Sequence, residues 1–284
     1  MERVAFAPRE EGVLASLGND STVRLWDVRT PSGPVGSAGG KGAAMGQCKV
    51  SKQSGIMAWH PEGREMVVGR KGGHIYNIDI RRLPSATSDP LQPGRFNLEA
   101  TENTVSAPQA EYTNLSFSNS GRELFATTTA SGVQILDYPS FTHLHTLSAF
   151  TGDTYEAEHS PSGSHVAIGT ASAMVVLYDT STWLTPHTLS HPQQLMPLRS
   201  LSFSFDGNFL VAGSGDHLGT SAKHEGGSGG AGLHIYHVES GEVVHTVDTT
   251  NCPTHVRWHP SRYWVAYGGD PGGLRVVGMG SSVL

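Results

Sequence analysis

The chain has 284 residues, of which 37% are hydrophobic and only 15% are charged, and it includes 35 glycines and 16 prolines. This composition favours many short strands joined by turns over long helices. The net charge of −6 has the wrong sign for a protein whose main affinity comes from neutralising phosphates, so autonomous nucleic-acid binding is not expected.

Neither a membrane segment nor a disulfide framework is expected. The longest apolar runs, such as residues 173–178, are far shorter than the roughly 20 residues that cross a bilayer. The first residues lack the charged and then apolar layout of a signal peptide. Cys48 and Cys252 are the only cysteines, and they have no metal-type spacing. We therefore expect an intracellular protein in a reducing compartment.

The clearest local signal begins near the N-terminal end of the sequence. Residues 14–17 alternate like a strand, residues 18–21 supply turn residues, and residues 22–28 alternate again. This pattern predicts a β-hairpin, and a further short strand precedes it, ending at Pro8.

Three antiparallel strands that end in Trp-Asp resemble the blade of a WD40 repeat. In that family the hairpin aspartate and the third-strand tryptophan belong to a buried polar network. The resemblance gives these structural roles to Asp20 and Trp26, with Asp27 ending the strand. Replacing Trp26 by Ala is then expected to cost about 3–5 kcal/mol of stability.

Weaker copies of this unit follow along the chain, and two anchors allow them to be counted. The first anchor closes each first strand, at Pro8, Pro61, Asn119, Pro161, Phe205 and Pro260. The second anchor ends each third strand, at Asp27, Asp79, Asp137, Asp179, His237 and Gly278. The two anchors lie 18 or 19 residues apart in five of the six copies. In the remaining copy, the fifth along the chain, they lie 32 residues apart. The 14 residues of a Gly/Ser/His-rich insertion at 219–232 account for that excess.

The copies predict an all-β chain, folded as a single WD40 β-propeller domain over residues 1–284 with six recognisable repeats. The approximate repeat cores are 1–30, 54–82, 112–140, 153–182, 198–241 and 252–280. Neither end of the chain clearly supplies the strand that usually closes such a ring. We therefore expect a seven-bladed propeller that lacks its N-terminal blade or closing strand; a six-bladed ring that closes imperfectly is the alternative.

The segments between the repeats are polar or rich in turn residues. Residues 31–46 are interpreted as a solvated loop before an outer strand at 47–50, and residues 144–147 as another outer strand. Residues 83–111 are interpreted as a long loop that either docks a partner or is partly disordered.

Four basic side chains lie around the second repeat's hairpin and third strand: Arg70, Lys71, Arg81 and Arg82. They are a candidate binding patch for acidic partners. The alternative is that they are ordinary solvated charges at strand ends, which is the commoner situation.

No catalytic, cofactor or metal site is expected. His60, His159 and His259 occupy equivalent repeat positions on separate blades, which favours structural roles over a shared metal ion. The aspartates that end four third strands are expected to cap backbone amides of the following turn, with a calcium-binding ring as the rival interpretation. Neither a Gly-x-Ser-x-Gly turn nor a phosphate loop is found. We therefore expect a non-enzyme with no cofactor and no small-molecule substrate.

Five runs, in order along the chain, resemble one family of WD40 proteins, subunit 3 of the THO complex, which is part of the TREX assembly. The runs are residues 23–30, 67–79, 135–139, 198–207 and 256–260. The most discriminating are Tyr138-Pro139 and the Arg-Ser-Leu-Ser-Phe-Ser run at 199–204. The family's first repeat has no counterpart here, and the insertion at 219–232 is specific to this sequence.

The resemblance implies a nuclear scaffold that couples transcription to mRNA processing and export. Its partners would be other THO/TREX subunits, and it would contact RNA mainly indirectly, through the complex. The alternative is another nuclear WD40 adaptor or a chromatin-associated peptide-binding module, which an acidic and aromatic central pocket would indicate.

Overall fold

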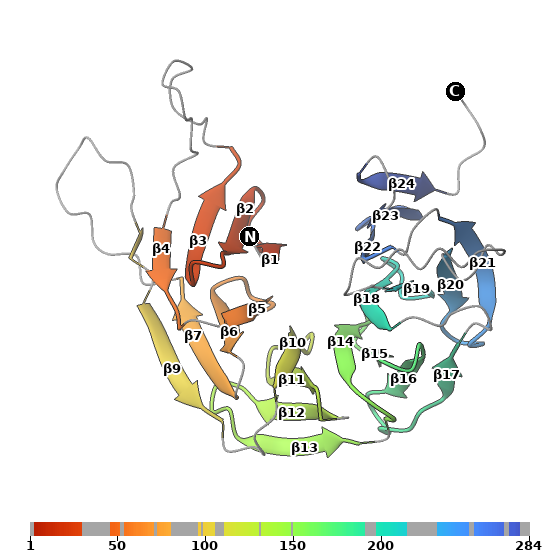
Figure 1. Cartoon of the computed structure of the whole chain (residues 1–284), viewed down its shortest axis with the longest axis horizontal. Coiled ribbons are helices and arrows are strands. Elements are labelled where there is room, and N and C mark those ends of the chain that lie inside the picture. Colours follow the sequence, from red (N-terminus) through yellow and green to blue (C-terminus); the bar gives the residue numbers. More distant parts are fainter. Residues whose placement is uncertain are drawn as a thin grey trace, which may run out of the picture. The chain divides into compact units, whose positions relative to one another are not determined.

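The computed structural model describes residues 3–29, 46–51, 54–70, 73–80, 96–97, 99–105, 111–130, 132–148, 150–190, 197–214, 232–249, 253–269 and 273–278. Every regular element in these ranges is a β-strand (Figure 1). None of the described residues forms a helix long and apolar enough to cross a bilayer. The chain divides into two compact units: unit 1 is Met1–Ala126 with Gln134–His145, and unit 2 is Thr127–Val133 with Thr146–Leu284.

Unit 1 contains two whole sheets. The first sheet has the order β1(Arg3–Phe6), β2(Val13–Leu17), β3(Thr22–Asp27), β4(Gly46–Lys49) and β8(Phe96–Asn97), with β8 parallel to β4. The second has the order β5(Ser54–Trp59), β6(Glu65–Arg70), β7(His74–Asp79) and β9(Glu99–Thr104). The boundary between the units passes through the third sheet, β10(Tyr112–Phe117), β11(Glu123–Thr128), β12(Val133–Asp137) and β13(His143–Leu147).

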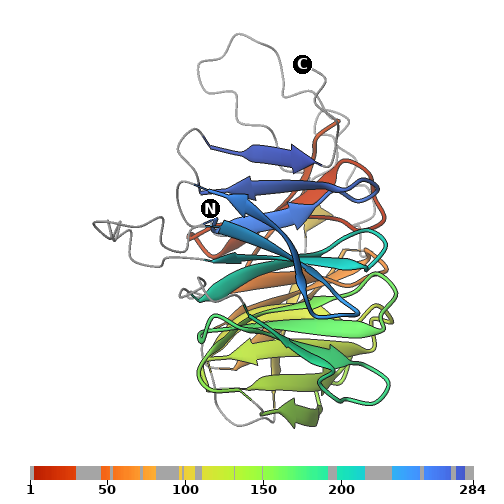
Figure 2. The same cartoon turned by 90° about the vertical axis from the view of Figure 1, so that its right-hand side faces the viewer.

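Unit 2 contains three whole sheets, whose antiparallel strands are seen from another side in Figure 2. The fourth sheet has the order β14(Thr154–His159), β15(His165–Thr170), β16(Val175–Asp179) and β17(His187–Leu189). The fifth has the order β18(Leu198–Phe203), β19(Phe209–Ser214), β20(Gly232–His237) and β21(Val243–Asp248). The described part of the sixth sheet is β22(His255–Trp258), β23(Trp264–Gly268) and β24(Arg275–Gly278).

Apolar layers between neighbouring sheets form the core. In β6, Met66 and Val68 belong to the layer between the first and second sheets, whereas Val67 between them belongs to the layer between the second and third. All three side chains are 0% exposed. Because this strand is covered on both faces, it is a continuous apolar run instead of an alternating one. A similar layer, with Leu177 and Leu201 among its members, joins the fourth and fifth sheets.

The strand ends confirm both sequence anchors. The six first strands end at Phe6, Trp59, Phe117, His159, Phe203 and Trp258, each two residues before its anchor. The six third strands end at the residues named from the sequence, from Asp27 in β3 to Gly278 in β24. The expected outer strands are confirmed as β4 and β13.

The interpretation of residues 83–111 as a loop is wrong in part, because it contains β9, the outer strand of the second sheet. The strand was missed because its sequence, Glu-Ala-Thr-Glu-Asn-Thr, shows no apolar alternation. Such alternation marks strands with a buried face, and Thr101 and Glu102 of this edge strand are exposed. Residues 31–45 and nearly all of the insertion at 219–232 lie outside the described residues.

Three of the first strands share an irregularity near their beginning. The pairing register shifts between Ser54 and Ile56 in β5, between Thr154 and Glu156 in β14, and between Leu198 and Ser200 in β18. Each shift leaves one extra residue on the first strand: Gly55, Tyr155 and Arg199. These are β-bulges, which re-aim a side chain locally and increase strand twist.

Candidate functional site

The network expected at the first hairpin forms only in part. The indole Nε1 of Trp26 donates a hydrogen bond to the hydroxyl oxygen of buried Ser16 at 2.8 Å. Asp20, in contrast, has a half-exposed side chain whose Oδ2 lies 2.5 Å from Nη2 of Arg24. This hydrogen bond holds the pKa of Asp20 below its usual value. The buried position expected for Asp20 is therefore wrong, because the carboxylate turns outward to a solvent-facing guanidinium.

Two of the aspartates at third-strand ends, Asp27 and Asp179, act as turn caps. Asp27 Oδ1 accepts a hydrogen bond from the backbone N–H of Arg29 at 2.9 Å. Asp179 Oδ1 accepts from the backbone N–H groups of Ser181 at 2.9 Å and Thr182 at 2.8 Å. These contacts confirm the capping role for Asp27 and Asp179.

The basic patch around the second hairpin remains a prediction. Arg70 ends β6, and its Nε is buried with no hydrogen-bond partner in the part of the chain that the structure describes. Lys71, Arg81 and Arg82 lie outside the described residues.

The expected equivalence of the three histidines is wrong for His159, which is itself the last residue of β14, whereas His60 and His259 each follow the last residue of a first strand. The three side chains have separate environments. His60 lies in unit 1, where its Nε2 is 3.2 Å from the carbonyl oxygen of Gly121. His159 lies in unit 2, where burial lowers its pKa to about 4. His259 accepts a hydrogen bond from the N–H of Ser261 at 3.2 Å. Within the described residues no three His, Cys, Asp or Glu side chains are grouped so that they could hold a metal ion.

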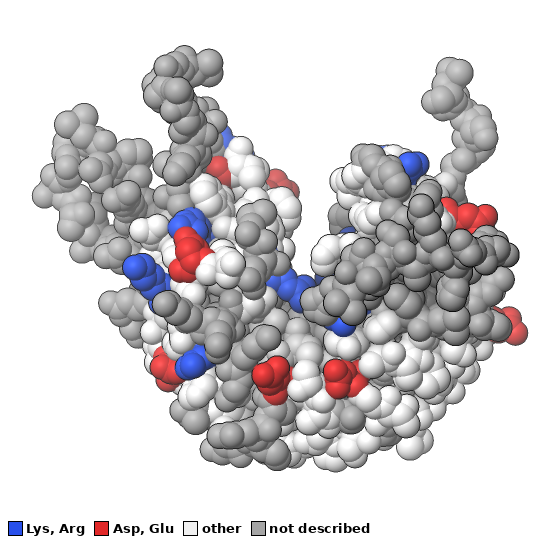
Figure 3. Space-filling model, viewed as in Figure 1, with Lys and Arg blue, Asp and Glu red and all other residues white. Residues whose placement is uncertain are grey.

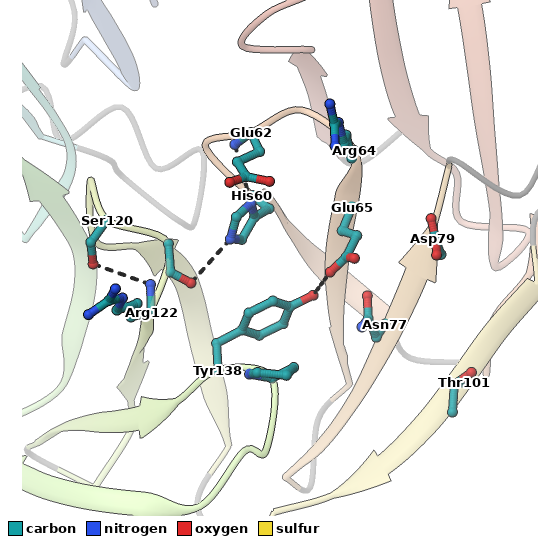
Figure 4. Close-up of a pocket in the computed structure, with 12 residues that line it drawn as sticks. His60, Glu62, Arg64, Glu65, Asn77, Asp79, Thr101, Ser120, Arg122 and Tyr138 are labelled. Atoms are coloured by element: carbon teal, nitrogen blue, oxygen red, sulfur yellow. Dashed lines mark hydrogen bonds between the residues drawn. The ribbon is translucent and has the colours of Figure 1, made fainter.

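A polar cavity in unit 1 lies between the second and third sheets and has a volume of about 550 Å³ (Figure 4). Its lining comes from the β5–β6 turn, the ends of β6 and β7, β9, the β10–β11 turn and the residues after β12. On the face of the molecule seen in Figure 3, acidic and basic side chains over unit 1 are interspersed instead of separated by sign. The cavity has the same mixed character, because three carboxylates and two guanidinium groups line it.

Tyr138 is the central side chain of this cavity. Its hydroxyl donates a hydrogen bond to Oε2 of Glu65, which joins the residue after β12 to the start of β6 (Figure 4). Its ring makes edge-to-face contacts with Phe117 at 5.0 Å and Phe141 at 5.5 Å between centroids. Such pairs add about 0.5–1.5 kcal/mol beyond area burial. The tyrosine is therefore held rigidly at the cavity floor.

His60 forms the adjoining part of the wall. Its Nδ1 accepts a hydrogen bond from the N–H of Glu62 at 3.2 Å, so Nε2 carries the proton that is donated to Gly121. Gly121 has a φ of 72°, and a Cβ at this position would collide with the His60 ring. Glycine is therefore required by both its backbone angle and the close approach of the imidazole.

Sequence reasoning did not find this cavity. Tyr138 stands in a run that resembles the THO family, and His60 lies next to the end of a first strand, but neither pattern indicates a cavity. Glu65, Asn77 and Arg122 carry no local signal, since they come from segments that meet only when the two sheets pack.

A second cavity, of about 280 Å³, is largely apolar and lies in unit 2 between the fifth and sixth sheets. Val211, Leu233 and Val265 are among its lining residues. The indole Nε1 of Trp258, which also lines it, is buried and has no hydrogen-bond partner among the described residues.

Comparison with known proteins defines the fold. A family model described as WD domain, G-beta repeat, matches residues 185–218, a stretch that includes β17, β18 and β19. The structure is also similar to the crystal structure of the β-propeller domain of Cps50 (Swd1) from Myceliophteria thermophila. The TM-score is 0.59 at 16% identity, covering 98% of this chain and 96% of that chain. The chain has a WD40 β-propeller fold.

Curated relatives of this WD40 propeller share about a quarter of its residues. THO complex subunit 3 of Arabidopsis thaliana is 26% identical over 95% of this chain and 72% of that protein. WD repeat-containing protein AAC3 of Dictyostelium discoideum is 25% identical over 72% of this chain and 38% of that protein. WD repeat-containing protein 82 of Drosophila melanogaster is 25% identical over 63% of this chain and 50% of that protein.

Proposed function

We propose that the protein is a non-catalytic WD40 scaffold subunit of a nuclear THO/TREX complex. In this role it couples transcription to mRNA processing and export through protein–protein contacts. The observation that carries the proposal is the similarity to THO complex subunit 3, which extends over 95% of this chain. Similarity to the other two relatives covers 72% and 63% of the chain.

The polar chemistry of the described residues supports a scaffold. The carboxylates of Asp27 and Asp179 cap turns, and that of Glu156 bonds to β18 and β22. The cavity between the second and third sheets combines a rigid aromatic floor with a mixed-charge wall, which suits a polypeptide segment. Contact with RNA would be indirect, since the chain has a net charge of −6.

The test is affinity purification of the full-length tagged protein from nuclear extract, followed by mass spectrometry of the co-eluting proteins. The other THO subunits are expected at amounts comparable to the tagged chain. A stable complex that lacks them would refute the THO assignment, and it would favour another nuclear WD40 adaptor or a chromatin-associated peptide-binding module. Direct RNA binding is checked separately: a submicromolar RNA complex that resists salt would contradict indirect contact.

A further inference from the structure

The loop between β16 and β17 presents a threonine that is followed by proline. Thr185 and Pro186 lie directly before β17, the outer strand of the fourth sheet (Figure 1), and both side chains are exposed. Leu184, which precedes them, is 68% exposed. A residue before proline is pushed toward extended backbone angles, because the proline ring clashes with the helical conformation. The loop therefore carries a hydroxyl on a short, exposed and extended segment.

The hydroxyl of Thr185 is not used by the fold. In this loop the hydroxyls of Ser181 and Thr182 donate to the carboxylate of Asp179 at 2.6 and 3.0 Å, and that of Thr180 donates to the carbonyl of Gly163 at 2.6 Å. No hydrogen bond joins the Thr185 hydroxyl to any part of the chain that the structure describes. This hydroxyl can therefore react without breaking an internal contact.

Ser160 and Pro161, a second pair of this kind, have the opposite arrangement. Ser160 is 1% exposed, and its Oγ accepts a hydrogen bond from the backbone N–H of His165 at 3.0 Å. The remaining Ser/Thr-Pro pair of the sequence, Thr30 with Pro31, lies outside the described residues. Burial thus distinguishes Thr185 from Ser160, although the two have the same short motif.

A phosphate on Thr185 would meet little positive charge from the chain around it. Residues 154–189, which contain the whole fourth sheet, include neither lysine nor arginine. His187 lies against the β20–β21 turn, where its Nε2 is 2.8 Å from the carbonyl oxygen of Glu239, and Glu242 belongs to the same turn. Since a phosphate group adds about −1.5 to −2 charges at neutral pH, these charges would stay free for a basic partner.

We propose that Thr185 is phosphorylated by a proline-directed protein kinase. Its Oγ1 attacks the γ-phosphorus of magnesium-bound ATP. The Oγ1–P bond forms as the bond from phosphorus to the ADP oxygen breaks, and the catalytic aspartate of the kinase takes the hydroxyl proton. Pro186 supplies the specificity, because proline has no backbone N–H that a closed apolar pocket would leave unpaired. The inference goes beyond the proposed function and does not depend on it.

The experiment uses the full-length protein with Thr30→Ala, so that Thr30 cannot contribute. The protein is incubated with magnesium ATP and, in separate reactions, a purified mitogen-activated protein kinase and a purified cyclin-dependent kinase. Fragmentation mass spectrometry locates the phosphate, which is expected on Thr185 and not on Ser160. Absence of phosphate from Thr185 in both reactions, or modification of Ser160 as fast as Thr185, would overturn the proposal.

Variants locate the acceptor. Thr185→Val keeps the shape of an exposed side chain and should lose the phosphate, whereas Thr185→Ser should keep it. Pro186→Ala should lower the rate of phosphorylation roughly tenfold. Thr188→Val is the matched control, because Thr188 is also exposed but is followed by Leu189, and it should leave the rate unchanged. Equal rates for wild type and Pro186→Ala would refute the proline-directed assignment, and undiminished phosphorylation of Thr185→Val would refute the acceptor.

Two further measurements extend the test to the intact cell and to the charge argument. Protein purified from nuclear extract in the presence of phosphatase inhibitors should yield the Thr185 phosphopeptide, and its absence would mean that the site is not used. The phosphorylated and unphosphorylated proteins should unfold at the same urea concentration. A clear shift between them would show that the phosphate contacts the fold and is not free for a partner.

Discussion

Arg257 Nη2 lies 3.0 Å from Glu156 Oε1, although the two residues are 101 positions apart in sequence. Arg257 belongs to β22 and Glu156 to β14, the first strands of two different sheets. The other carboxylate oxygen of Glu156 accepts a hydrogen bond from the N–H of Leu201 at 2.7 Å. Arg257 also donates to the carbonyl oxygen of Leu201. One ion pair therefore ties β14 and β22 to β18, which lies between them.

Glu156→Gln should lower the free energy of unfolding by about 1–2 kcal/mol. The side chain of Glu156 is 5% exposed, whereas that of Arg257 is 56% exposed and can be hydrated when its partner is lost. This places the effect below that of a fully buried pair. Urea denaturation measures it, with exposed Glu239→Gln as the control. If the two variants unfold at the same urea concentration, the ion pair contributes nothing to stability.

Two neighbouring residues, Glu158 and His159, should give opposite dependences of stability on pH. Burial, only partly offset by the charge of Arg257, raises the pKa of Glu158 to about 7. The folded protein then keeps a proton that the unfolded chain releases, so this contribution falls as pH rises toward 7. Burial lowers the pKa of His159 to about 4, so its contribution falls as pH drops from about 6.5 toward 4.

The two slopes oppose each other between about pH 4.5 and 6.5. Glu158→Gln is expected to remove one of them and leave a stability that rises with pH by on the order of 1 kcal/mol across this range. Melting temperatures of wild type and variant, taken at intervals from pH 4.5 to 7.5, measure the difference. Parallel profiles would show that Glu158 titrates normally in the folded protein.

Trp26 is only partly buried, so the cost of Trp26→Ala should be about 2–3 kcal/mol, below the value expected from the sequence. Trp26→Phe keeps most of the ring and removes the donor to Ser16, which should cost about 1 kcal/mol. Ser16→Ala removes the same hydrogen bond from the other side. The double variant should therefore cost less than the sum of the two single variants, as measured by urea denaturation; strict additivity would mean that the bond does not contribute.

Asp179→Ala should speed hydrogen exchange at the backbone amides of Ser181 and Thr182, because both donate to its carboxylate. Asp179→Asn keeps an acceptor oxygen and should change these rates much less. Hydrogen bonds, led by that of the Ser181 hydroxyl, lower the pKa of Asp179 to about 2. The wild-type turn should thus keep its slow exchange until the pH falls close to that value, and loss of protection near pH 4 would contradict the cap.

The strands were predictable from sequence because turn residues and apolar runs are local signals. Asp27 and Asp179 mark strand ends since a short acidic side chain can cap the turn that follows. The side-chain partner of Asp20, in contrast, could not be predicted from the sequence. The partner of Asp20 depends on which way a half-exposed carboxylate turns, and a cation four residues away decided it.

The polar cavity was not predictable because packing creates it. Tyr138 meets Glu65 across 73 residues of sequence, and neither position has a motif that announces the other. Asn77 lies between Tyr76 and Ile78 in β7, and its neighbours in the strand give no sign of the cavity that it lines.

The bulges at Tyr155 and Arg199 bring these two extra residues together, with the Arg199 guanidinium carbon 4.0 Å from the centre of the Tyr155 ring. Deleting a residue elsewhere in β14 or β18 would reverse the face of every side chain on one side of the gap. At the bulge, the loss of one residue restores regular pairing and leaves the rest of the strand facing as before. β14 and β18 therefore each contain a position where the repeat can change length by one residue, during divergence or by design, without moving its buried side chains to the solvent face.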